Sequence, residues 1–282
     1  MSWFVERGPL AGLSPRRRLL VTAVVAVVAL FATGLAAVLF ANSLLHDRRL
    51  VGGAVPPSDR PGPVVLVPGY GGGRTGLLDL AERLRQRGRD ARVMTLPGAG
   101  TGDLREQAAA LETVVSDLLA DGAPSVDVVG YSAGGVVARV WAREYDGPSR
   151  ARRIVTLGAP HDGAELAATA ASVAPERCPD ACQQLVPDSD LLRELADDPV
   201  GSAPRWVSIA SQVDETVPPA SARLVGALNV VVQDVCPAAS VPHGALPTDP
   251  LSAGLVLDVL GPEPVQQPTR ADCATLRALG SR

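Results

Sequence analysis

The chain has 282 residues, 46% of them hydrophobic, and a formal net charge of −4. A chain of this length can build one large α/β domain together with a short additional segment. Because the charge is acidic and no basic patch alternates with aromatic residues, we expect no nucleic acid among the partners. No Cys-x-x-Cys motif or Cys/His cluster indicates a metal site, so we expect neither a metal nor another cofactor.

The first 45 residues predict a membrane segment. Residues 1–18 end in three arginines, Arg16 to Arg18, and residues 19–45 carry no charge. A helix over residues 19–45 exceeds the roughly 30 Å of a bilayer's hydrocarbon core, and the positive-inside rule places the arginines in the cytoplasm. We therefore expect a cytoplasmic segment over residues 1–18, a transmembrane helix over 19–45, and an extracellular catalytic domain at the cell membrane.

Two alternatives exist for this segment. A cleaved signal peptide would release a secreted domain, although its apolar region is usually shorter, about 7–15 residues. A buried core helix is the second alternative. Residues 46–62 combine charged side chains with Gly and Pro and are typical of a linker. We expect the folded domain over residues 63–262 and a C-terminal tail over residues 263–282.

Short apolar runs rich in β-branched residues alternate with helical spacing after residue 63. The predicted strands cover residues 64–67, 91–96, 126–129, 153–157, 207–210 and 230–232. The predicted helices cover residues 77–87, 103–120, the stretch after Ser132, and residues 251–260. Such alternation is typical of an α/β fold, so we expect about six mainly parallel strands in one sheet with helices on both faces.

The alternation fails between residues 162 and 204. This segment contains Cys178, Cys182 and several prolines, with only short helical stretches. We expect a lid-like insertion above the carboxyl ends of the strands, where it would form a lid or a wall of an acyl pocket. A surface excursion unrelated to substrate is the alternative.

The segment Gly130-Tyr131-Ser132-Ala133-Gly134 matches G-x-S-x-G. It lies between a predicted strand and a predicted helix, which is the context of a nucleophile elbow. A Cβ atom at Gly130 or Gly134 would collide with the neighbouring strand or helix. The hydroxyl of Ser132 would then lie at the positive end of the following helix, where an oxyanion can develop. A plain glycine-rich turn is the alternative.

A serine hydroxyl is a weak nucleophile near neutral pH and needs a base and an orienting carboxylate. After such an elbow, the acid precedes the histidine along the chain. The chain has three histidines, His46, His161 and His243. Only His243 follows the last predicted strand, in a turn-rich loop that lets its imidazole reach Ser132. We expect His243 to be the base and His161 to be a packing or supporting residue.

Two aspartates can supply the carboxylate. Asp214 follows the fifth predicted strand and Asp162 follows the fourth, so both preserve the chain order. We favour Asp214 for its strand-end position, whereas Asp162, directly before Gly163, also suits a turn. Glu215, next to Asp214, would point elsewhere.

Two backbone amides are expected to stabilise the oxyanion. One is the N–H of Ala133, directly after the nucleophile, and the other is the N–H of Tyr70 in the loop after the first strand. The glycines around Tyr70 let the backbone approach a substrate closely. A phosphate-binding glycine loop is excluded, because neither of the two glycine patterns that bind phosphates is present.

The four cysteines favour two disulfides in an oxidising compartment. Three pairings are possible, and the sequence does not distinguish among them. We expect the bonds Cys178–Cys182 and Cys236–Cys273. Four buried free thiols would be the better interpretation if the domain were cytosolic.

Five segments together carry a resemblance to a known family. They are Val-Pro-Gly-Tyr-Gly-Gly, Gly-Tyr-Ser-Ala-Gly-Gly, Thr-Leu-Gly-Ala-Pro-His-Asp-Gly, Ser-Gln-Val-Asp-Glu-Thr-Val-Pro and Val-Pro-His-Gly. Over residues 63–260 the chain resembles the bacterial lipase and esterase branch of the α/β-hydrolase fold, whose small secreted members lack the first two strands. The resemblance implies a catalytic triad of Ser132, Asp214 and His243, with Tyr70 and Ala133 as oxyanion donors.

The chain departs from the family pattern at Pro68, where such lipases usually carry a histidine, and in its membrane segment. Together the observations predict a serine carboxylic-ester hydrolase, a lipase or esterase, acting through an acyl-enzyme on acyl or lipid esters outside the cytoplasm. A cell-envelope acyltransferase with the same triad is one alternative. A hydrolase-like domain that binds a partner without chemistry is another.

Overall fold

The structure is a computed structural model. It describes residues 59–201 and 205–281, together with residues 14, 16, 17, 19, 20, 24 and 56. The predicted transmembrane segment, residues 19–45, and the predicted linker, residues 46–62, therefore lie mostly outside the described residues. Over the residues that are described, no helix combines the length and the apolar character that crossing a bilayer requires. The chain divides into two units, Met1–Gly52 and Gly53–Arg282, and the second contains the sheet.

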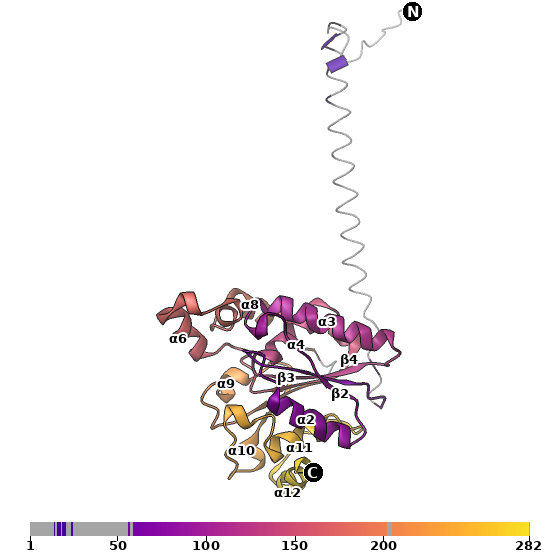
Figure 1. Ribbon diagram of the computed structural model, residues 1–282, viewed down its shortest axis with the longest axis vertical. Coiled ribbons are helices and arrows are strands. Elements are labelled where there is room, and N and C mark those ends of the chain that lie inside the picture. Colours follow the sequence, from indigo (N-terminus) through magenta and orange to yellow (C-terminus); the bar gives the residue numbers. More distant parts are fainter. Residues whose placement is uncertain are drawn as a thin grey trace, which may run out of the picture. The chain divides into compact units, whose positions relative to one another are not determined.

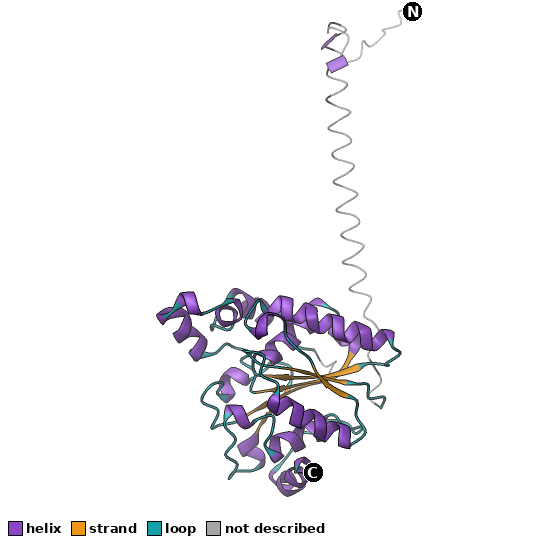
Figure 2. Cartoon of the chain, viewed as in Figure 1, coloured by secondary structure: helices purple, strands orange, loops and turns teal. Residues whose placement is uncertain are grey.

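Six parallel strands form the sheet at the centre of this second unit (Figure 2). They are β1 (Val64–Val67), β2 (Ala91–Val93), β3 (Val126–Tyr131), β4 (Ala151–Leu157), β5 (Arg205–Ala210) and β6 (Leu228–Val231). Their order across the sheet is β2-β1-β3-β4-β5-β6, and each neighbouring pair is parallel. The six predicted strands are confirmed. However, β2 ends at Val93 rather than at residue 96, and β3 continues to Tyr131.

Successive side chains of each strand point to opposite faces of the sheet and so contribute to two cores. In β1, Val64 and Leu66 belong to the core on one face. Val65 and Val67 belong to the core on the other face, and all four side chains are completely buried. Burial on both faces explains why the strands are continuous apolar runs in the sequence.

Helices cover both faces of the sheet, as predicted (Figure 1). The helices of this unit are α2 (Thr75–Gln86), α3 (Leu104–Ala120), α4 (Ala133–Glu144), α5 (Gly147–Arg150), α6 (Glu165–Val173), α7 (Asp180–Gln184), α8 (Asp190–Ala196), α9 (Pro219–Ala222), α10 (Val232–Val235), α11 (Pro250–Val259) and α12 (Cys273–Gly280). α3 and α4 pack on the face that carries Val65, whereas α2 and α11 pack on the face that carries Val64. Asp103 caps α3, because its side chain accepts the N–H of Arg105 at 2.8 Å.

The C-terminal residues, expected to be a tail, contain the helix α12 packed along α11. Two glycines permit the close approach of α12 to α11. A Cβ atom at Gly254 would lie 1.9 Å from the carbonyl oxygen of Leu276, and one at Gly280 would lie 1.9 Å from that of Pro250. A helix of 8 residues is marginal by itself, so its formation depends on these tertiary contacts, which local sequence patterns do not show.

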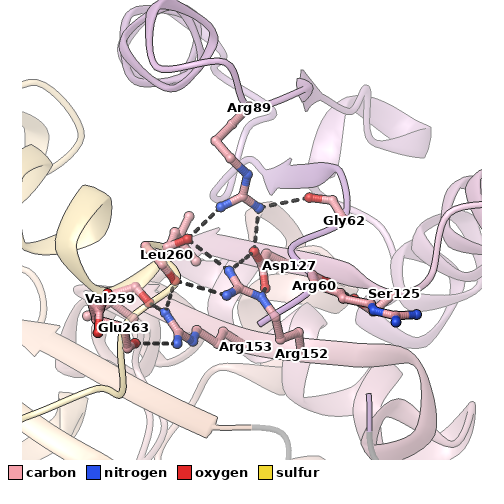
Figure 3. Close-up of polar contacts among 11 residues, drawn as sticks. Arg60, Gly62, Arg89, Ser125, Asp127, Arg152, Arg153, Val259, Leu260 and Glu263 are labelled. Atoms are coloured by element: carbon pink, nitrogen blue, oxygen red, sulfur yellow. Dashed lines mark hydrogen bonds and ion pairs between the residues drawn. The ribbon is translucent and has the colours of Figure 1, made fainter. Parts of the chain in front are cut away.

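A buried carboxylate binds two arginines near the amino end of β3 (Figure 3). Asp127 is completely buried and accepts hydrogen bonds from Nε of Arg152 at 3.1 Å and from Arg89 at 2.6 Å. Both arginines also donate to the carbonyl oxygen of Leu260, the residue after α11. The guanidinium groups thus neutralise the carboxylate and satisfy a carbonyl at a helix end that lacks an intrahelical donor.

We expect Asp127→Asn to lower the free energy of unfolding by about 3–5 kcal/mol, because it leaves buried guanidinium groups without their counter-charge. Urea denaturation near neutral pH measures this change. Asp90→Asn is the matched control. It removes an ion pair with Arg92 whose two side chains are about half exposed, so its effect should be far smaller. Equal destabilisation by the two substitutions would contradict a special role for Asp127.

Candidate active site

Ser132 lies at a sharp turn between β3 and α4. Its backbone has φ 53° and ψ −128°, a conformation that residues other than glycine rarely adopt. A Cβ atom at Gly130 would lie 2.5 Å from Cα of Gly135 in α4, and one at Gly134 would lie 2.3 Å from the carbonyl oxygen of Val67 in β1. The geometry agrees with the helix and strand collisions expected from the sequence.

A third glycine of this turn was not singled out from the sequence. A Cβ atom at Gly135 would lie 2.4 Å from Cβ of Ala159, directly after β4. The backbone of α4 therefore lies directly against the end of β1 and against the small side chains of Thr156 and Ala159 at the end of β4. The Gly-Gly pair at 134–135 was the signal that could have revealed this second contact.

The structure brings Ser132, His243 and Asp214 together in one line of hydrogen bonds. Nε2 of His243 lies 3.0 Å from Oγ of Ser132, and Nδ1 of His243 lies 2.7 Å from Oδ2 of Asp214. The other carboxylate oxygen of Asp214 accepts the backbone N–H groups of Thr216 at 2.9 Å and Val217 at 2.8 Å. These amides hold the buried carboxylate in its orientation toward the imidazole.

The residues considered as alternatives for the base and the acid are not part of this line of hydrogen bonds. In the described part of the chain, neither Asp162 nor Glu215 shares a hydrogen bond with His243. His161 is buried, and its Nε2 lies 3.1 Å from the hydroxyl oxygen of Thr156. Burial, together with the positive charge of Arg139, lowers the pKa of His161 to about 3. His161 is thus a neutral, buried side chain, whereas His46 lies outside the described residues.

The two amides expected to stabilise an oxyanion border the nucleophile. Ala133 is the first residue of α4, so its N–H has no intrahelical acceptor. Tyr70 follows Gly69, where an added Cβ would lie only 2.9 Å from Cβ of Ser132. The loop after β1 therefore passes directly beside the serine. The role of both amides as oxyanion donors stays a prediction.

Gly158, the residue directly after β4, was not singled out from the sequence either. Its φ is +54°, and an added Cβ would lie 2.6 Å from Cδ1 of Leu246, 3.0 Å from Oδ2 of Asp214 and 3.2 Å from Nδ1 of His243. The Asp214–His243 pair therefore packs directly on a backbone without a side chain. A glycine immediately after a buried strand, in Thr-Leu-Gly-Ala-Pro, was the available signal.

A cavity of about 430 Å³ opens beside Ser132 and His243. The insertion supplies much of its lining, with Ala164, Leu166, Ala167, Ala170, Arg177, Cys182 and Leu185. Residues 164–185 of the insertion therefore form a wall of this cavity. Most of these side chains are apolar, and Arg177 is the one formal charge among them.

The cysteines form the two expected disulfides, Cys178–Cys182 and Cys236–Cys273. The first ties the loop after α6 to α7 within the wall of the cavity, and the second joins the end of α10 to α12. Across the residues that the structure covers, no group of three or more His, Cys, Asp or Glu side chains is arranged to hold a metal ion.

The chain is similar to known proteins mainly in its fold. A family model described as the α/β-hydrolase fold matches residues 62–187, a range that includes Ser132 and ends before Asp214 and His243. A comparison with curated protein sequences finds no match.

Several solved structures are similar to this one at low sequence identity. Lipase B of Aspergillus fumigatus has a TM-score of 0.63 at 18% identity over 80% of this chain and 58% of the lipase. Lipase BlEst2 of Bacillus licheniformis, in its mature form, has a TM-score of 0.52 at 22% identity over 64% of this chain and 86% of its own. Phospholipase PlaB of Legionella pneumophila has a TM-score of 0.51 at 15% identity over 77% and 62%, respectively. The chain thus spans less than two thirds of the first and third of these proteins.

We expect Gly158→Ala to slow the reaction of Ser132 with a fluorophosphonate probe by about tenfold or more, because the added methyl group displaces the imidazole from its partners. Gel fluorescence over time measures the labelling rate. Gly88→Ala is the matched control, since Gly88 has a similar φ of +76° but open space around its Cβ position. Labelling of Gly158→Ala at the wild-type rate would show that this close packing does not affect the reactivity of Ser132.

Proposed function

Because this chain has the α/β-hydrolase fold, we propose that it is a serine hydrolase of carboxylic esters. One observation carries the proposal: Ser132, His243 and Asp214 form a continuous hydrogen-bonded line at the mouth of a cavity. This arrangement has a nucleophile, a base within reach of its proton, and a carboxylate that orients the base. Nothing in this chemistry requires a cofactor.

The proposed reaction has two halves. His243 takes the proton of Ser132 through Nε2 while the serine oxygen attacks the ester carbonyl, and Asp214 stabilises the resulting imidazolium. The negative charge on the carbonyl oxygen is met by the N–H groups of Ala133 and Tyr70. His243 then protonates the leaving alcohol, which gives an acyl-enzyme. A water molecule, deprotonated by the same imidazole, attacks this ester and releases the acid.

The shape of the cavity supports an aliphatic acyl chain as the substrate group. Ala167 and Ala170 are three residues apart and lie on one face of α6, and Ala164, directly before the helix, also lines the cavity. Leu185, after α7, adds a further apolar side chain. Small residues on the inner face of α6 keep the space beside Ser132 open. We propose esters with acyl groups longer than acetyl, among them lipid esters.

We also propose that residues 19–45 anchor the protein in the cell membrane with the catalytic domain outside. The uncharged stretch after Arg16–Arg18 and the two disulfides support this localisation. We expect the full-length protein to remain with the membrane fraction after alkaline extraction. A shortened, soluble protein lacking the first residues would instead indicate a cleaved signal peptide. Immunoblotting with an antibody against the catalytic domain distinguishes the two.

A p-nitrophenyl ester series from acetate to long-chain acyl groups tests the reaction. We expect kcat/KM to rise from acetate to longer esters, and Ser132→Ala to lower it by at least about a thousandfold. A fluorophosphonate probe should label the intact protein and fail to label Ser132→Ala. Absence of labelling of the intact protein would exclude both hydrolase and acyltransferase activity.

Two variants of α6 locate the acyl chain in the same assay. Ala170→Trp fills the cavity, so it should reduce hydrolysis of long-chain esters about tenfold relative to acetate. Thr169→Trp introduces the same indole side chain at an exposed neighbouring position that does not line the cavity. If Ala170→Trp lowered hydrolysis of acetate and long-chain esters equally, the acyl chain would lie elsewhere.

A further inference from the structure

Tyr131 stands directly before the nucleophile, at the variable position of the elbow. It ends β3, and its ring packs against the apolar core. The ring centroid lies 5.2 Å from that of His243, with the two planes tilted by 32°. The Tyr131 hydroxyl donates a hydrogen bond to the backbone carbonyl oxygen of His243 at 3.2 Å. One side chain of the elbow therefore contacts both the imidazole and the backbone of the base.

The loop that carries His243 is anchored on both sides of the base by the buried side chains of Ala239, Val241 and Leu246. It runs between α10 and α11, and its backbone hydrogen bonds are local. The N–H of Ala245 bonds to Pro242 at 2.9 Å, and the N–H of Leu246 bonds to His243 at 3.2 Å.

Further along the loop, side chains outside it donate to the carbonyl oxygens of Ala239, from Gln233, and of Thr248, from Arg83. Within residues 240–246, across the described ranges, Tyr131 is the one residue outside the loop that hydrogen-bonds the backbone. The hydroxyl of Tyr131 is therefore the polar contact at the backbone of the base itself, between the apolar anchors at Val241 and Leu246.

We propose that Tyr131 is a positioning residue, which holds His243 in line with Ser132 through the hydrogen bond from its hydroxyl to the His243 carbonyl. The inference rests on the proposed function of Ser132. Tyr131 and Ser132 are consecutive, so one rigid turn both presents the nucleophile and sets the place of the base. The 3.0 Å approach of Nε2 to Oγ is sensitive to any shift of the loop.

The hydroxyl is suited to this role over the whole neutral pH range. Burial, with a smaller effect of the negative charge of Asp214, raises the pKa of Tyr131 to about 12. The group therefore keeps its proton and remains a donor whenever the imidazole of His243 can act as a base. Phenylalanine would preserve the ring contacts and remove this donor alone.

Tyr131→Phe tests the proposal. We expect kcat on a short-chain p-nitrophenyl ester to fall about tenfold with KM unchanged, because misplacement of the base affects the transition state and not substrate binding. The rate of fluorophosphonate labelling should fall by the same factor. Tyr145→Phe, which removes a hydroxyl at the end of α4, is the matched control and should keep wild-type rates. A wild-type kcat for Tyr131→Phe, or a raised KM with an unchanged kcat, would overturn the proposal.

Hydrogen exchange provides a readout that needs no ester hydrolysis. In Tyr131→Phe, amide exchange over residues 240–247 should become faster, while exchange over the strands and the thermal unfolding midpoint stay close to those of the wild type. The same measurement on Tyr145→Phe should show no change in this loop. Unchanged exchange of the loop, or faster exchange throughout the domain, would contradict a positioning role. Inactivity of the wild type would instead count against the proposed function.

Discussion

The site depends on the close approach of the α4 backbone to the ends of β1, β3 and β4. Glycines at 130, 134 and 135 make this approach possible, because side chains there would collide with backbone or with Ala159. The same approach forces Ser132 into a positive φ and aims the amino end of α4 at its hydroxyl. The strain at one residue is thus the consequence of packing a helix directly on a sheet, and it presents the serine to the cavity in a fixed position.

The two ends of the sheet carry different groups of residues. Since all strands are parallel, their carboxyl ends share one edge, and this edge collects Ser132, Gly158 and Asp214 from three neighbouring strands. Toward the opposite end, the carboxylate of Asp127 and the arginines around it link β3, β4 and the end of α11. The strained and reactive groups therefore lie apart from the buried ion pairs that hold the layers together.

The wall of the cavity is built differently from the rest of the domain. α6 has no buried side chain, so burial of apolar surface contributes little to its position. Its start is held by the hydrogen bond from the N–H of Ala164 to Leu185, and the loop after it by the disulfide Cys178–Cys182. Covalent and polar ties thus hold α6 itself, whereas α7 and α8 of the same segment are anchored by buried side chains such as Ala181 and Leu195. One face of α6 therefore lines the cavity instead of packing into the core.

The sequence by itself determined the order of strands and helices, the elbow around Ser132 and the chain order of Ser132, Asp214 and His243, because these follow from local patterns of apolar residues, glycines and turns. It also led to the expected disulfide pairing. The tertiary structure alone decided that Asp214 rather than Asp162 reaches His243, that Gly158 makes room for this pair, that Tyr131 bonds the His243 loop, and that α12 docks on α11. These facts are distances between residues far apart in the chain. Local patterns carry no information about these distances, because the packing of the helices on the sheet determines the position of each side chain.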